Sequence, residues 1–238
     1  MGTRLNKILA RAGLTSRRGA DRLVAEGRVV VNGLRVTTPG VLVDPAVDRV
    51  EVDGRPLPRS EPHEYFVVYK PRGYVTTRRD PHGRPVVTEL VRGARARLYP
   101  VGRLDFDVEG VLLLTNDGSL THRLLHPRYA LPRVYEVVVL GRVAAGELPA
   151  WRAGVELDDG FARPTAVARA GEVAGGTVLR LTFTEGRKHE VKRYCAALGH
   201  PVRALRRVAF GPLTLGDLRP GQARPLTDRE VGQLRTVR

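Results

Sequence analysis

The chain has 238 residues, 42% of them hydrophobic, which is enough for one large domain or two smaller ones. No apolar stretch approaches the roughly 20 residues of a membrane-spanning helix, the N-terminus has no apolar signal region, and the single cysteine, Cys195, excludes an internal disulfide and a paired-thiolate zinc site. The 40 Lys and Arg against 25 Asp and Glu give a net charge of +15, which favours a polyanionic partner in the cytoplasm.

The first sixty residues predict a small basic module. Apolar residues at positions 5, 8 and 9 mark one helix that ends near Gly13, and Ser16 is suited to cap a second helix that Gly27 ends. Residues 28–36 predict a hairpin with an Asn-Gly turn, and residues 50–54 another short strand. The basic side chains of this segment include Arg4, Lys7, Arg17, Arg18 and Arg22.

Residues 3–55 resemble the compact RNA-binding module shared by a small-subunit ribosomal protein, tyrosyl-tRNA synthetases and many RNA-modifying enzymes. The resemblance rests on Arg-Leu-Asn-Lys-Ile-Leu-Ala-Arg-Ala-Gly, followed by Ser-Arg-Arg and Val-Asn-Gly. The alternative is a solvated pair of helices that only supports the rest of the chain. Because the basic residues are clustered, we favour RNA docking by residues 1–60.

A Pro-rich, charged segment at about 55–62 is typical of a linker, because proline sustains neither a helix nor a central strand. A larger domain is expected over 63–238. Its predicted strands are 64–69, 110–114, 134–140 and 177–184, which are rich in β-branched and apolar residues. Helices interrupt them, so we expect an α+β fold with a mixed, mostly antiparallel sheet.

The segment from Val101 to Gly118 is the most informative part of this domain. The sequence Val-Gly-Arg-Leu-Asp places Asp105 two residues after Arg103 and just before an apolar, strand-like run, which an Asn-Asp-Gly turn closes. Loops at strand ends carry functional side chains on a rigid scaffold, so we expect Asp105 at a strand edge facing a cleft. Asp105 is the candidate catalytic residue.

A second basic cluster runs from Arg187 to Arg207, and we expect it to contact phosphates. A helix beginning near His189 has a buried stripe at positions 191, 194, 195 and 198. Lys192 lies at the border of that stripe. Its side chain either reaches into a cleft or packs its stem on apolar surface while the ammonium stays in water.

Among the histidines, only His122 and His126 have the i, i+4 spacing that is typical of metal ligands on a helix. Arg123 stands where a zinc protease has glutamate, so we favour structural roles for both histidines and expect no metal.

The chain resembles the RsuA/RluB-type ribosomal RNA pseudouridine synthase family over nearly its full length. The resemblance is carried by Lys-Pro-Arg-Gly from Lys70, Gly-Arg-Leu-Asp with Leu-Leu-Leu-Thr-Asn-Asp-Gly, and Arg-Val-Tyr-Glu-Val from Arg133. It continues through Glu-Gly-Arg-Lys-His-Glu-Val-Lys-Arg from Glu185, Ala-Leu-Gly-His-Pro-Val, and Phe-Gly-Pro-Leu-Thr-Leu-Gly-Asp-Leu. Two departures are Val108, where the family usually has Thr or Ser, and Glu190, where it often has Gln; we expect Glu190 to weaken the positive field of Lys192.

The resemblance implies isomerisation of uridine to pseudouridine without a cofactor or metal. Asp105 then either attacks the sugar or removes the C2′ proton, Lys192 pairs with Asp105 and keeps it ionised, and Tyr135 stacks on the uracil and assists loss of the C5 proton. Arg103 fills the space left by the flipped base. The residues expected to contact RNA are Arg103, Arg4, Lys7, Arg17, Arg18, Arg22, Lys70, Arg187, Lys188 and Arg193.

Several alternatives stay open at this point. Instead of contacting the uracil, Tyr135 is a strand aromatic packed in the core. Instead of stacking in the RNA, Arg103 forms a structural ion pair within its loop. The whole chain is otherwise a non-catalytic ribosomal-RNA-binding or ribosome-assembly factor. A methyltransferase is disfavoured because no glycine-rich cofactor loop follows an early strand. Closer similarity to the RluB-like members favours large-subunit rRNA, and the lack of an apolar seam favours a monomer.

Overall fold

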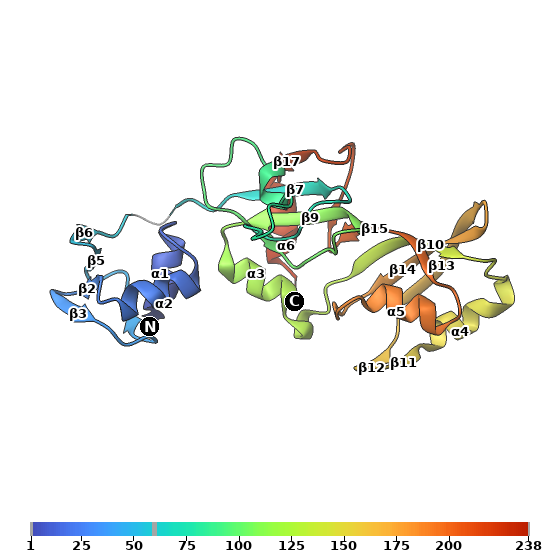
Figure 1. The fold of residues 1–238 in the computed structure, drawn as a ribbon, viewed down its shortest axis with the longest axis horizontal. Coiled ribbons are helices and arrows are strands. Elements are labelled where there is room, and N and C mark those ends of the chain that lie inside the picture. The colour runs from blue at the N-terminus through green and yellow to red at the C-terminus, as the bar shows by residue number, and fades with distance from the viewer. Residues whose placement is uncertain (1, 59–60, 238) are drawn as a thin grey trace. The chain divides into compact units, whose positions relative to one another are not determined.

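The computed structural model describes residues 2–58 and 61–237, which form two compact units (Figure 1). One holds the chain up to His63 together with Arg95–Arg97, and the other holds Glu64–Ala94 and the chain from Leu98 onward. Within the described residues, no helix is long and apolar enough to cross a membrane.

The N-terminal unit is built from two short helices and two small sheets. The predicted helices are confirmed, and Ser16 caps the second by accepting a hydrogen bond from the Gly19 N–H (3.1 Å). The predicted hairpin is also confirmed and lies in an antiparallel sheet of order β3-β2-β5-β6. The elements are β1 (Thr3–Arg4), α1 (Leu5–Arg11), α2 (Arg17–Ala25), β2 (Val29–Val31), β3 (Leu34–Val36), β4 (Leu42–Val43), β5 (Val50–Val52) and β6 (Arg55–Pro56).

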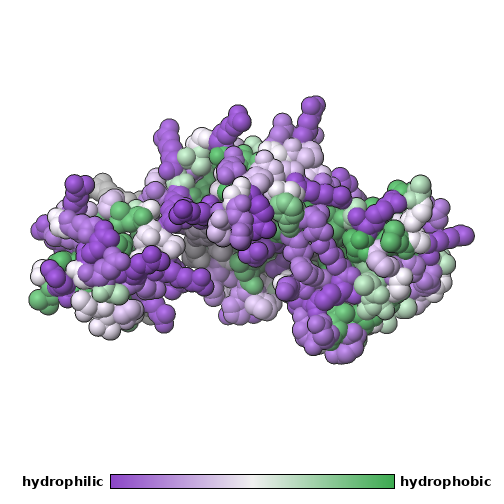
Figure 2. Space-filling view, viewed as in Figure 1, coloured by the Kyte–Doolittle hydropathy of each residue, from purple (hydrophilic) through white to green (hydrophobic). Residues whose placement is uncertain are grey.

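The two helices and the sheet of this unit enclose a small apolar core. Leu5, Ile8 and Leu9 from α1 pack against Ala20 and Val24 from α2. The arginines at positions 4, 17, 18 and 22 are exposed, and Lys7 is half-buried. Figure 2 shows hydrophilic side chains over much of the visible face of each unit. The helices of the N-terminal unit therefore bury one side and present cations on the other.

The C-terminal unit is organised around a nine-stranded sheet of order β13-β14-β10-β15-β9-β7-β17, with β8 beside β9 and β16 beside β15. The expectation of a mostly antiparallel sheet is confirmed, since β15 and β9 are its one parallel pair among the described strands. The strands are β7 (Tyr65–Lys70), β8 (Tyr99–Val101), β9 (Glu109–Thr115), β10 (Arg133–Leu140), β13 (Ala166–Val173), β14 (Gly176–Phe183), β15 (Val202–Phe210), β16 (Leu213–Thr214) and β17 (Ala223–Pro225).

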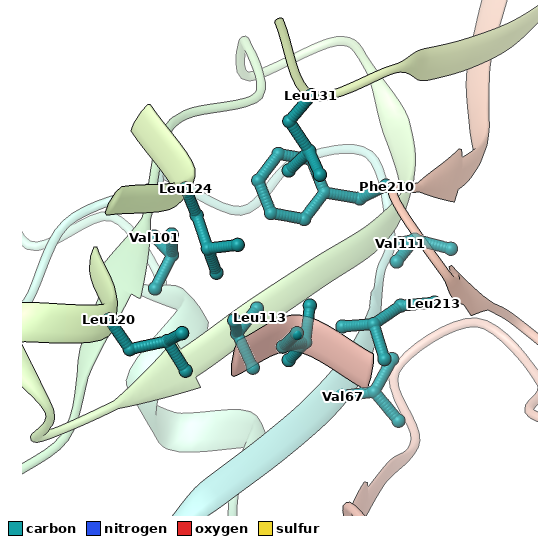
Figure 3. Packing of buried hydrophobic residues seen from close by; sticks show 10 residues of the cluster. Val67, Val101, Val111, Leu113, Leu120, Leu124, Leu131, Phe210 and Leu213 are labelled. Carbon is teal, nitrogen blue, oxygen red and sulfur yellow. The ribbon is translucent and has the colours of Figure 1, made fainter. Parts of the chain in front are cut away.

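One apolar cluster packs on the face of β9 that carries Val111 and Leu113 (Figure 3). Leu112 and Leu114, on the other face of this strand, are buried as well. Helices α3 (Gly118–Leu125) and α6 (Asp228–Arg235) contribute leucines to it, and Phe210 closes it at the end of β15. The Asn-Asp-Gly sequence after β9 is the start of α3: Asp117 caps the helix by accepting from the N–H groups of Ser119 and Leu120 (both 3.0 Å).

A second group of elements covers the other half of the sheet. These are α4 (Leu148–Ala153), the hairpin of β11 (Val155–Leu157) and β12 (Gly160–Ala162), and α5 (Glu190–Ala197), with a short 3₁₀ turn at Ala145–Glu147 before α4. Two other 3₁₀ turns lie elsewhere: Val87–Leu90 contacts β7 and β8, and Pro127–Tyr129 follows α3. The predicted stripe of α5 is confirmed for Val191, Tyr194 and Cys195, which are buried. Tyr194 packs edge-on against Trp151 and Phe183, so α5 is anchored to α4 and β14.

Candidate active site

A cavity of about 920 Å³ opens in the C-terminal unit. Its walls are the loop before β9, the first half of β10, the segment that leads into α5, and the last half of β15. Residues far apart in the sequence line it, including Asp105, Tyr135 and Lys192, the three predicted catalytic residues. The sheet order explains why these residues lie close together, because β10, β15 and β9 are neighbouring strands.

Asp105 lies in the loop between β8 and β9, four residues before β9 begins. Its side chain is 37% exposed and faces two basic groups: Oδ2 is 3.6 Å from Lys192 Nζ, and Oδ1 is 3.6 Å from His189 Nε2. Both distances are longer than a direct hydrogen bond. The carboxylate is therefore held in a positive environment without being tied to one partner.

Lys192 makes its shortest contacts with a different carboxylate. Its Nζ donates to both oxygens of Asp107, at 2.7 and 2.8 Å. This hydrogen bond is the largest cause of a pKa of Asp107 below its usual value. Lys192 thus bridges Asp107 and Asp105, whereas the sequence predicted a pair with Asp105 alone.

The predicted RNA contact of Lys70 is wrong, because this side chain is not at the surface. Its side chain is fully buried, and its ammonium donates to the carbonyl oxygens of Val108 (2.6 Å), Asp105 (2.9 Å) and Pro71 (3.1 Å). Burial lowers the pKa of Lys70 to about 8, opposed by the charges of Asp107 and Asp105. Lys70 therefore fixes the backbone of the loop that carries Asp105.

His189 is a residue of the cavity that the sequence reasoning missed. It precedes α5 with φ of +52°, in the left-handed region that few residues other than glycine adopt. This conformation places the ring beside Asp105, one helical turn before Lys192. The available signal was this spacing, which puts His189 and Lys192 on the same side of the helix start.

Tyr135 and Arg207 are paired across β10 and β15 and both line the cavity. Tyr135 is half-buried, so it is a cavity-wall residue rather than a core aromatic. Arg207 is 2% exposed, although the sequence placed it in a basic cluster that contacts phosphates. The expected phosphate contact at the molecular surface is wrong for Arg207, because its guanidinium lies inside the cavity wall.

The other predicted RNA-binding residues of this unit fall into two groups. Arg103 and Lys188 are exposed at the cavity rim, and no carboxylate within the described residues forms an ion pair with Arg103. Arg187 donates to the carbonyls of Gly160 (2.8 Å) and Phe161 (2.7 Å), and Arg193 to Asp159 (2.9 and 2.7 Å). Arg187 and Arg193 are therefore engaged by the β11–β12 hairpin.

The two departures from the family pattern both lie at the cavity. Val108 is buried, and its N–H donates to the Asp105 carbonyl (3.1 Å). Glu190 is 5% exposed and accepts from the Arg187 N–H (3.4 Å), while burial raises its pKa. The observed partner of Glu190 is thus Arg187, rather than Lys192 as expected from the sequence.

Comparisons with known proteins identify the family of this chain. The sequence model of the RNA pseudouridylate synthase family matches residues 64–197, and that of the S4 domain matches residues 3–50. The chain therefore belongs to the RNA pseudouridylate synthase family, whose members are isomerases, and carries an N-terminal S4 domain.

Similar proteins cover the chain almost completely. An RNA pseudouridine synthase of Aquifex aeolicus is 48% identical, with 98% of this chain and 94% of the relative aligned. The ribosomal large subunit pseudouridine synthase B of Bacillus subtilis is 40% identical over 98% of this chain and 96% of its own. A crystal structure of a pseudouridylate synthase has 30% identity and a TM-score of 0.66, covering 97% of this chain and 99% of the other.

Proposed function

We propose that this protein converts a specific uridine of large-subunit ribosomal RNA to pseudouridine. Membership of the synthase family gives the reaction class, and the relative from Bacillus subtilis supports the ribosomal substrate. The observation that carries the proposal is the cavity in which the Asp105 carboxylate stands with Tyr135 and Lys192. The three side chains come from three separate elements, and the fold brings them together.

The reaction begins at the bond between C1′ of the ribose and N1 of the uracil. Asp105 either attacks the sugar or removes the C2′ proton, and both routes need an ionised carboxylate. The ammonium of Lys192, 3.6 Å away, favours that charged form. The detached base then turns and rejoins the sugar through C5, and the C5 proton is lost, so the exchange is an isomerisation.

The cavity walls hold the base during this exchange. Tyr135 stacks on the uracil and assists loss of the C5 proton. A base within folded RNA must leave its stack to enter the cavity, which costs a few kcal/mol. Arg103, exposed at the rim, compensates by stacking in the vacated position, since its planar guanidinium suits that contact.

The two units divide the work. Residues 1–60 dock on structured RNA through the arginines of α2, and residues 63–238 carry out the chemistry. The segment at 55–62 connects them; within it, Arg55–Pro56 forms an edge strand of the N-terminal sheet. The protein acts as a monomer in the cytoplasm, where ribosomal RNA is found, and its reaction requires neither metal nor cofactor.

Release of tritium tests the function directly. The protein is incubated with ribosomal RNA carrying tritium at uridine C5, and tritium released to water is measured. We expect release by the natural protein and by Asp217→Asn, an exposed control outside the cavity, and none by Asp105→Asn. Equal release from Asp105→Asn would remove Asp105 from the mechanism, and no release from any variant would favour the non-catalytic assembly factor.

A further inference from the structure

Arg207 places a buried charge in the wall of the cavity. Its side chain is 2% exposed, and its Nε donates to the Val111 carbonyl at 2.9 Å. Within the described residues, the buried Nη2 atom has no hydrogen-bond partner. A buried donor without a partner is destabilising, and more so where the group is charged, so the position of Arg207 calls for a functional explanation.

The surrounding structure holds this guanidinium firmly. Its Cζ lies 4.9 Å from the centre of the Phe210 ring, which belongs to the apolar cluster of Figure 3. Gly110, the parallel partner of Arg207 on β9, has φ of +125°, and a Cβ there would come within 2.1 Å of the Arg207 carbonyl oxygen. Glycine at position 110 is thus required for β9 to approach β15 this closely.

The charge of Arg207 lies beside Tyr135 in the cavity wall. Arg207 lines the cavity and is the cross-strand partner of Tyr135, whose charge and hydrogen bond with the guanidinium favour its charged form. Within the described residues no carboxylate forms an ion pair with Arg207. The wall beside Tyr135 therefore presents a positive charge to whatever occupies the cavity.

The chemistry of the proposed reaction supplies a matching negative charge. When the C1′–N1 bond breaks, its electron pair goes to N1, and the charge spreads over the O2 and O4 carbonyl oxygens. This holds whether Asp105 attacks the sugar or removes the C2′ proton. When C5 joins C1′, C5 loses its proton and N1 gains one, so atoms and electrons balance without a further reactant.

We infer that Arg207 is a catalytic residue whose guanidinium charge, in the cavity wall beside Tyr135, stabilises the detached uracil anion. The inference rests on the proposed function and adds a residue to it. A uracil stacked on Tyr135 lies beside Arg207, the cross-strand partner of that tyrosine. Because the guanidinium is fixed and buried before the RNA binds, it stabilises the developing charge without reorganising.

Single-turnover kinetics with two RNA substrates tests this role. The target nucleotide is either uridine or 5-fluorouridine, whose fluorine withdraws electrons and makes the base a better leaving group. Consumption of the nucleoside is followed by nuclease digestion and mass spectrometry, and RNA affinity is measured separately. The variants are Arg207→Met, Arg207→Lys and the matched control Arg206→Met, whose arginine pairs with Glu136 outside the cavity.

We expect Arg207→Met to lower the rate with uridine by about 100-fold while RNA affinity changes less than about 3-fold. With 5-fluorouridine the deficit should shrink by about tenfold, because the better leaving group depends less on the guanidinium. Arg207→Lys should lie between the natural protein and Arg207→Met. For the control Arg206→Met, the rate relative to the natural protein should be the same with uridine and with 5-fluorouridine.

Equal deficits with both substrates, or a loss of affinity as large as the loss of rate, would overturn the role of Arg207. Should Arg207→Met fail to fold in circular dichroism, the same substrate comparison on Arg207→Lys decides the matter. Absence of conversion by the natural protein would overturn the proposed function together with this inference. Conversion with equal deficits would overturn the inference alone.

Discussion

Asp105 works within a network of charges in which each residue has more than one neighbour. Lys192 bridges Asp105 and Asp107, and His189 stands on the other side of the Asp105 carboxylate. The contacts of Asp105 at 3.6 Å leave both of its carboxylate oxygens accessible to a nucleoside.

Lys192→Ala should lower the single-turnover rate far more than RNA affinity. Removing the ammonium leaves Asp105 and Asp107 without their shared cation, which favours protonation of one of them. We expect a rate loss of about 100-fold or more, equivalent to roughly 2.7 kcal/mol or more, and an affinity change below about 3-fold. Lys192→Arg keeps the charge and should recover part of the rate. A loss of affinity proportional to the loss of rate would identify Lys192 as a phosphate contact instead.

Glu190→Gln should stabilise the protein at neutral pH. Burial raises the pKa of Glu190 above its ordinary 4.5, so the folded state binds its proton more tightly than the unfolded state does. The ionised carboxylate therefore costs stability as pH rises through the raised pKa, and the cost disappears below about pH 4.5.

We expect the melting temperature of Glu190→Gln to exceed that of the natural protein by about 2–4 °C at pH 8, and the gap to close near pH 4. Differential scanning calorimetry across this range measures it. Glu147→Gln is a control of opposite sign, because hydrogen bonds from Ala144 N–H and His200 lower the pKa of Glu147. A gap independent of pH would show that ionisation of Glu190 is not the cause.

At the scale of elements, the loop between β8 and β9 depends on a buried cation. The ammonium of Lys70, at the end of β7, donates hydrogen bonds to two carbonyl oxygens of that loop, those of Asp105 and Val108, and to the carbonyl oxygen of Pro71. Hydrogen bonds from a charged donor are stronger than those between neutral groups. The strand that ends at Lys70 therefore determines where the Asp105 carboxylate stands.

Lys70→Met should destabilise the fold and slow the reaction while leaving RNA affinity nearly unchanged. The substitution leaves several buried carbonyl oxygens without a donor, at a cost on the order of 3 kcal/mol. Urea unfolding measures the stability, and filter binding measures the affinity. Arg72→Met, at an exposed position two residues on, is the control. A large loss of affinity without loss of stability would restore the RNA contact that the structure contradicts.

The sequence predicted those features that depend on local pattern. The stripe of α5, the cap at Ser16 and the hairpin turn follow from spacing within a few residues. The burial of Lys70 and Arg207 did not follow, because it depends on contacts between strands about 40 and 100 residues apart. A charged residue is normally exposed, so residue type alone favours a surface role.

For the whole molecule, the net charge of +15 overstates the surface available to RNA. Several arginines are neutralised within the fold: Arg193 by Asp158 and Asp159, Arg28 by Asp53 and Glu26, and Arg206 by Glu136. The exposed arginines of α2, by contrast, have no carboxylate within ion-pair distance among the described residues. We therefore expect the S4 domain to contribute more to phosphate binding than the distribution of basic residues along the sequence indicates.

Substituting Arg17, Arg18 and Arg22 with Gln should weaken RNA binding and reduce its salt dependence. Removing one arginine–phosphate pair lowers the slope of log affinity against log salt by about 0.7–0.9, so removing three lowers it by about 2–3. Binding measured from 50 to 300 mM KCl gives the slope. Arg28→Gln is the matched control, because its guanidinium is already paired. The rate at saturating protein should remain that of the natural enzyme, since chemistry occurs in the other unit; an unchanged slope would show that RNA does not dock on α2.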